Sequence, residues 1–127
     1  MVYSLLPHEG SLSAEEVVRP AYELNNRTVM AEGTLTVPAA APVTISEPNI
    51  ICEAVKMAED VSDAYVVRLY ECERNRTLCR ITFGKGVRVW KTNMLEEIQS
   101  EVPLDSGSAE IEFSPFEIVT LLIKREN

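Results

Sequence analysis

The feature that most constrains this chain is the alternation of apolar and polar residues in short segments from residue 43 onward. Ala109, Ile111 and Phe113 fall on one face of one such segment, and residues 118–125 alternate in the same way. A period of two is typical of strands that bury one face. Several such segments, separated by turn residues, predict an all-β fold, an antiparallel β-sandwich.

The expected elements follow from this pattern and from one helix signal. The predicted strands are residues 3–6, 49–57, 65–72, 77–83, 87–92, 109–113 and 118–125. Ser13 and Glu16 have the spacing of a capping box, which predicts one short N-terminal helix over residues 14–19. Pro20 is expected to break or kink that helix because its ring removes a backbone donor, and residues 21–25 would then restart a turn.

The apolar faces also suggest which strands are neighbours. We expect the strand at 65–72 to form a hairpin with 77–83 and to pair on its other side with 49–57. The predicted pairs are Leu69 with Ile81, Val67 with Phe83, Val55 with Leu69, Met57 with Val67, Lys56 with Arg68, and Cys52 with Cys72. The pattern determines which face each residue lies on better than it determines which residue lies opposite, because a slip of one residue would expose the whole apolar face. Opposed cysteines would lie within disulfide reach, so oxidation would join Cys52 to Cys72.

Length and charge limit the classes of protein and partner. The chain has 127 residues, which predicts a single domain over 1–127, with the Pro/Ala stretch 37–42 as a short connection. A formal charge of −8 argues against nucleic acid and anionic membranes as partners. The chain has no apolar run long enough to span a bilayer and no signal peptide at its start, so we expect a cytoplasmic protein.

The residue types that carry chemistry form no recognisable site. His8 is the single histidine, and Cys52, Cys72 and Cys79 lack the spacing of a zinc site. Adjacent carboxylates such as those at 96–97 are typical of loops, and no serine has the partners of a catalytic triad. We therefore predict no catalytic residue, no metal ligand and no cofactor in this chain.

A charged cluster is expected where the strands at 49–57 and 65–72 meet. Lys56 and Arg68 would repel each other if opposed, and Glu59, Asp60 and Glu71 are the nearby anions. Two interpretations remain open. The cluster is either a solvated face with weak surface pairs or an inter-domain contact.

Two aromatic residues fall on the parity opposite to the core. Tyr70 and Trp90 share that parity with Arg68, Arg80 and Arg88, and such a mixture is typical of interfaces. The rings either pack beneath the N-terminal segment or form a platform for a sugar or a protein partner.

Several segments, in order along the chain, resemble one family. These segments are residues 6–10, 21–25, 53–60, 67–71, 93–97 and 114–121, and the most specific reads E-A-V-K-M-A-E-D followed by V-R-L-Y-E. Together they resemble the C-terminal β-domain of glycoside hydrolase family 38 α-mannosidases. Cys72 and the turn at 73–76 differ from the Pro-x-Gly type of turn expected in that family.

The resemblance implies a non-catalytic structural domain of a larger enzyme. In the family, a larger N-terminal α/β domain hydrolyses α-mannosides with retention, using zinc held by Asp and His and an Asp nucleophile. None of those motifs occurs here, so no catalytic or zinc residue is assigned. The implied partner is the catalytic domain of the same polypeptide, with mannosides as the substrates of the whole enzyme.

Two other functions remain open from the residues alone. A carbohydrate-binding module would need Tyr70 and Trp90 exposed together. A free-standing sandwich would recruit a partner through an edge strand. An excised domain would also expose apolar surface and self-associate through it.

Overall fold

The computed structural model describes residues 3–26, 30, 32–34 and 41–126. The chain divides into two compact units, Met1–Ala39 and Ala40–Asn127, which we describe separately. The expected single domain stays a prediction. Most of the expected Pro/Ala connection, residues 37–40, lies outside the described residues. No helix in the described part of the chain is long and apolar enough to cross a membrane.

The first unit contains one helix, α1, over Ala14–Asn25. The capping box is confirmed, since Glu16 N donates to Ser13 Oγ (3.3 Å) and Ser13 N donates to Glu16 Oε2 (2.9 Å). The expected helix end at residue 19 is wrong, because the helix continues through Pro20 to Asn25, and the alternative expectation of a kink at Pro20 stays a prediction. Proline keeps a helical φ, so the helix loses one hydrogen bond there without ending.

The expected strand at residues 3–6 is also wrong. These residues are irregular and exposed, and Tyr3 and Leu5 have 81% and 94% of their surface in solvent. A strand needs a neighbour for its backbone groups, and no strand in the described part of the chain pairs with them.

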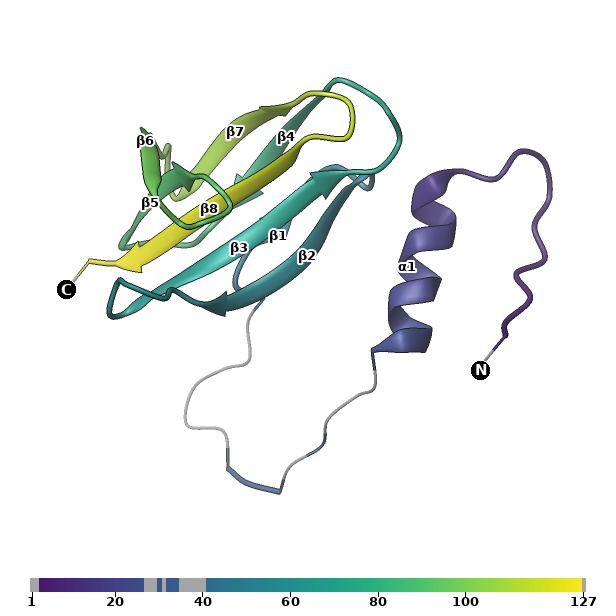
Figure 1. Cartoon of the computed structure of the whole chain (residues 1–127), viewed down its shortest axis with the longest axis horizontal. Coiled ribbons are helices and arrows are strands. Elements are labelled where there is room, and N and C mark those ends of the chain that lie inside the picture. The colour runs from purple at the N-terminus through teal and green to yellow at the C-terminus, as the bar shows by residue number, and fades with distance from the viewer. Residues whose placement is uncertain (1–2, 27–29, 31, 35–40, 127) are drawn as a thin grey trace. The chain divides into compact units, whose positions relative to one another are not determined.

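The second unit is a β-sandwich of two antiparallel sheets (Figure 1). The strands are β1 (Thr44–Ile45), β2 (Ile50–Met57), β3 (Ala64–Glu71), β4 (Thr77–Thr82), β5 (Val87–Thr92), β6 (Ile98–Val102), β7 (Ser108–Phe113) and β8 (Ile118–Arg125). One sheet has the order β1-β4-β7 and the other has the order β2-β3-β8-β5-β6. The predicted all-β sandwich with one helix is confirmed.

The core lies between the two sheets. Alternate residues of β3, β5 and β8 from the larger sheet pack against residues of β4 and β7 from the smaller one. Among the fully buried side chains are Val67, Leu69, Ile81, Phe113 and Leu121. These residues share the parity expected from the sequence, and burying each of them stabilises the fold by about 1.5–3 kcal/mol.

The expected hairpin between β3 and β4 is wrong. β3 pairs with β2 and β8, whereas β4 pairs with β1 and β7 in the other sheet. Leu69 and Ile81 are both core residues, but they belong to facing layers rather than to paired strands. The connection after Glu71 therefore crosses from one sheet to the other.

The pairing of β2 with β3 is correct, but its partners differ. Val55 lies opposite Val67 rather than Leu69, a shift of two residues. The part of β2 after the bulge therefore has the predicted parity. A bulge between Cys52 and Ala54 shifts the register, and Cys52 lies opposite Leu69 rather than Cys72. The expected Lys56–Arg68 pair is also wrong, because Lys56 faces Val66.

Candidate interaction surface

The outer face of the five-stranded sheet, turned away from the core, carries four of the residues singled out from the sequence, which are Lys56, Arg68, Tyr70 and Trp90. Arg68 and Tyr70 of β3 point to this face, as do Trp90 of β5 and Thr120 of β8. Part of the face is apolar and buried, because Ala64, Val66 and Leu122 form a small second cluster against which Trp90 packs.

The loop between β5 and β6 folds back over this face. Asn93 shapes the loop, since its Oδ1 accepts from Leu95 N (2.9 Å) and from Glu97 N (3.0 Å). Met94 lies over β8, where Thr120 Oγ1 is 3.9 Å from Met94 Sδ. Arg68 holds the same loop from β3, because its Nη2 donates to Met94 O (3.3 Å).

Glu96 connects this loop to β2 and its following turn. Its carboxylate forms an ion pair with Lys56 and accepts from Glu59 N (2.9 Å). The Lys56 hydrogen bond, and then the Glu59 amide, lower the pKa of Glu96, whose side chain is only 10% exposed. The same hydrogen bond raises the pKa of Lys56, which also lies 3.6 Å from Glu59 Oε2.

The structure therefore brings together three of the five residues of the predicted charged cluster, Lys56, Glu59 and Arg68, around the β5–β6 loop. Asp60 is exposed in the turn after β2. Glu71 lies on the opposite, core-facing parity of β3 and is 1% exposed.

Glu71 instead closes one end of the sandwich. It accepts from Asn49 Nδ2 (3.0 Å), Glu73 N (2.7 Å) and Phe116 N (3.0 Å). Asn49 Nδ2 also donates to Thr77 Oγ1 (2.8 Å), which links the network to the smaller sheet. Burial raises the pKa of Glu71, but these hydrogen bonds outweigh burial and the pKa is lowered overall.

Tyr70 and Trp90 lie on the same outer face but far apart along it. Tyr70 pairs with Ile118 and Trp90 with Leu122, four residues further along β8, a separation of about 13 Å. Both side chains are half-buried, and the Arg88 guanidinium lies 4.9 Å from the Trp90 ring centre. The two rings therefore do not form one continuous platform, and their predicted binding role stays a prediction.

The thiols and the histidine do not converge on a site. Cys72 and Cys79 are buried thiols, and burial raises the pKa of the half-buried Cys52. His8 is exposed in the first unit. In the described part of the chain, no group of three or more His, Cys, Asp or Glu side chains is arranged to hold a metal ion, so these residues do not fit a zinc site.

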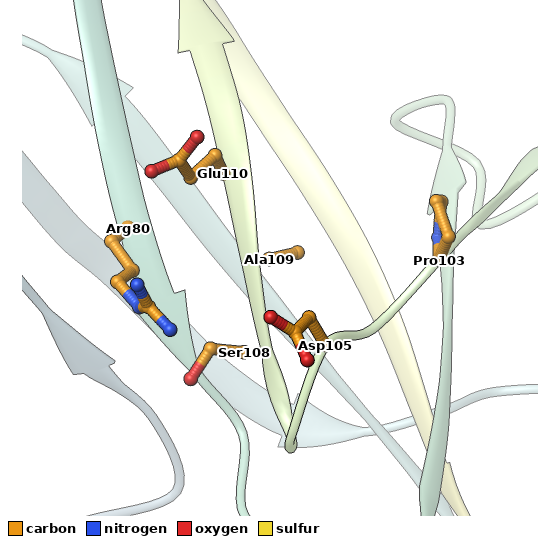
Figure 2. Close-up of a pocket in the computed structure, with 6 residues that line it drawn as sticks. All are labelled: Arg80, Pro103, Asp105, Ser108, Ala109 and Glu110. Atoms are coloured by element: carbon orange, nitrogen blue, oxygen red, sulfur yellow. The ribbon is translucent and has the colours of Figure 1, made fainter.

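A hollow of about 280 Å³ lies on the other sheet, beside β7 (Figure 2). Arg80 comes from β4, Ser108, Ala109 and Glu110 from β7, and Pro103 and Asp105 from the segment before β7, as Figure 2 shows. Arg80 and Glu110 are direct partners across the strand pair. The charged side chains are exposed and of mixed sign. Arg80, which the sequence grouped with Tyr70 and Trp90 by parity, lies here on the other sheet.

Sequence reasoning missed Glu96 as a member of the charged cluster. It lies 40 residues from Lys56 in the chain, and adjacent carboxylates at 96–97 are an ordinary loop feature. The signal that was present is the segment 93–97, one of those that carry the family resemblance. The structure brings this segment into contact with Lys56, Glu59 and Arg68. These three residues belong to segments 53–60 and 67–71, which also carry the resemblance.

Comparison with known proteins identifies the domain. Residues 49–121 match the model of the glycosyl hydrolases family 38 C-terminal beta sandwich domain. Alpha-mannosidase 2C1 of Homo sapiens is 30% identical over 95% of this chain, and alpha-mannosidase G of Dictyostelium discoideum is 29% identical over 93%. The chain spans only 12% of the length of each of these relatives.

The matched region begins at Asn49, just before β2, and ends at Leu121, within β8. It therefore includes the charged cluster, the β5–β6 loop and the turn that binds Glu71. The fold of this region, two antiparallel sheets in a sandwich, agrees with the family description. The chain belongs to the family of glycoside hydrolase family 38 C-terminal β-sandwich domains.

Proposed function

We propose that this chain is the non-catalytic C-terminal domain of an α-mannosidase and that it supports the catalytic part of the same polypeptide. The observation that carries the proposal is the family match over residues 49–121. It is supported by relatives named as α-mannosidases, of which this chain corresponds to a 12% portion.

The reaction of the whole enzyme belongs, in this proposal, to another part of the polypeptide. That reaction is the retaining hydrolysis of α-mannosides, and zinc would bind mannose hydroxyls in the catalytic domain. The residues described here supply no ligand set for that metal. The cytoplasmic location expected from the sequence stays a prediction.

The charged cluster has a defined part in this proposal. Lys56, Glu59 and Arg68 hold the β5–β6 loop on the outer face, so they determine the shape that this face presents to the rest of the enzyme. Charges at the edge of such a contact determine orientation more than they add affinity.

An activity assay tests the proposal. The 127-residue chain and the longest polypeptide encoded by its gene are each incubated with a chromogenic α-mannoside. We expect turnover by the longer polypeptide and none by the chain alone. Turnover by the chain alone, or a gene that encodes no further α-mannosidase sequence, contradicts the proposal.

Charge reversal tests the part played by the cluster. In the longer polypeptide, Lys56→Glu or Arg68→Glu should lower activity or thermal stability, because each change releases the loop from its β-strand partner. Lys85→Glu is the matched control, since Lys85 is an exposed cation in the turn between β4 and β5. Unchanged kinetics and melting for both cluster variants would refute this role.

A further inference from the structure

The turn between β7 and β8 holds a phenylalanine in a conformation that favours glycine. Glu117 N donates to Ser114 O (3.0 Å), which closes a four-residue turn with Pro115 in its second position. Phe116, in the third position, has a φ of 59°. Turns with a positive φ at this position prefer glycine or asparagine, and another residue there is strained by about 1–3 kcal/mol.

The backbone of this turn is held firmly from several sides. Phe116 N donates to the buried Glu71 (3.0 Å), and Ser114 N donates to Glu117 Oε2 (2.8 Å). Lys91 from β5 pairs with Glu117 Oε1 at 3.1 Å. A glycine in place of Phe116 would keep every one of these contacts, because none of them uses the Phe116 side chain.

The ring of Phe116 adds little to the sandwich itself, because 62% of the residue is exposed to solvent. The sequence therefore places an exposed aromatic residue at a position where glycine would adopt the same φ without strain. Interface anchors are typically aromatic side chains of this kind, and their benefit comes only when a partner covers them.

Further exposed or half-buried apolar side chains lie on the outer face of β8, the strand that this turn leads into, and of its neighbours. Ile118, two residues further along the chain, is 54% exposed and pairs directly with the half-buried Tyr70. Met94 is 55% exposed and lies over Thr120, the next residue of β8 on the same face. We call Tyr70, Met94, Phe116 and Ile118 the Phe116 patch.

We propose that the Phe116 patch is the surface through which this domain docks onto the remainder of its own polypeptide, with the Phe116 ring as the anchor. This inference rests on the proposed function. The relatives extend far beyond this chain, which matches 12% of their length, so most of such a polypeptide is available to cover the patch. A second copy is a poorer occupant because each copy carries a formal charge of −8.

Hydroxyl-radical footprinting, read out by mass spectrometry, tests this inference. The 127-residue chain and the longer polypeptide from its gene are labelled in parallel. We expect Phe116 and Met94 to react readily in the chain and at least fivefold more slowly in the longer polypeptide. Leu78, which is 59% exposed on the outer face of the smaller sheet, is the internal control and should react in both.

A substitution gives an independent readout. Phe116→Gly should leave the melting temperature of the chain unchanged or raise it, because the strain is relieved. The same substitution should lower the melting temperature of the longer polypeptide, whereas Leu78→Ala should not.

The outcomes separate the two proposals. Equal labelling of Phe116 in an active longer α-mannosidase overturns the docking surface and leaves the proposed function standing. Protection of Phe116 that depends on the concentration of the chain alone identifies a second copy as the occupant and overturns the inference. A gene without further α-mannosidase sequence overturns the proposed function.

Discussion

At the scale of single residues, Glu71 illustrates how one buried carboxylate organises an end of the sandwich. It accepts from a side chain before β2 and from backbone amides after β3 and before β8. A charged acceptor is suited to this position because hydrogen bonds to charged groups contribute about 1.5–3 kcal/mol, more than neutral ones. The same carboxylate would destabilise the domain if its donors were removed.

Replacement of this carboxylate tests its structural role. Glu71→Gln should lower the free energy of unfolding by about 1.5–3 kcal/mol, because the amide places a donor against backbone donors. Chemical denaturation of the chain measures this change. Glu110→Gln, at an exposed position in β7, is the control and should change stability by less than about 0.5 kcal/mol.

The pH dependence of stability follows from the same group. The pKa of Glu71 lies below the ordinary glutamate value of 4.5, as do those of Glu96 and Glu117. A lowered folded pKa contributes stability that is complete above the unfolded value and is lost as pH falls through the folded value. The melting temperature should therefore be nearly constant from pH 7 to about 5.5 and fall below about pH 4.5. A melting temperature that rises on acidification through that range would contradict this assignment.

At the scale of elements, the β5–β6 loop behaves as a structured part of the sheet rather than as a simple connection. Glu96 has a φ of 67°, and its carboxylate reaches both Lys56 and the Glu59 amide. The contacts of Met94 with Arg68 and Thr120 attach the same loop to β3 and β8. The outer face therefore has a fixed surface shape, which a flexible loop would not give it.

Hydrogen exchange measures how firmly this loop is attached. Glu96→Ala should accelerate exchange of the Glu59 amide, because that amide loses its acceptor. Glu101→Ala removes an exposed carboxylate that pairs with Arg88 elsewhere on the sheet, and it should leave Glu59 unchanged. Equal exchange at Glu59 in both variants would show that the Glu96 contact does not form in solution.

At the scale of the whole molecule, the sandwich depends on contact between two sheets of unequal size. Phe113 of β7 is fully buried in the layer between them, whereas Phe116 lies three residues later and is largely exposed. Phe113 therefore contributes to core packing, whereas Phe116 is the residue that we propose for surface recognition. The same division applies to Leu121 and Ile118 on β8, which are buried and exposed respectively.

Truncation of each phenylalanine tests this division. Phe113→Ala should lower the free energy of unfolding by about 3–5 kcal/mol, because it leaves a cavity between the sheets. Phe116→Ala should change it by less than about 1 kcal/mol, since the ring is mostly in solvent and the backbone stays equally constrained. Denaturant titration of the isolated chain compares the two variants, and similar losses for both would contradict the assigned burial.

The sequence by itself was sufficient to predict most strands and the face that each one buries. Alternation places Val67, Leu69 and Phe113 on the core side, and the capping box locates the start of α1. These features are local, because the parity of a strand and the cap of a helix depend on residues a few positions apart. The segments that resemble the family were likewise readable as short motifs. β6 was missed because Gln99, Ser100 and Glu101 are exposed on an edge strand and do not alternate.

Only the tertiary structure decided which strands are neighbours and which polar groups meet. β3 and β4 have equally suitable apolar faces for pairing or for stacking, and the local pattern is the same in either case. Packing between whole layers selects stacking. It also places Glu96 beside Lys56 and the Phe116 amide within hydrogen-bond distance of the buried Glu71 carboxylate. These contacts join residues about 40 positions apart, and they form only because the sheets pack as a unit.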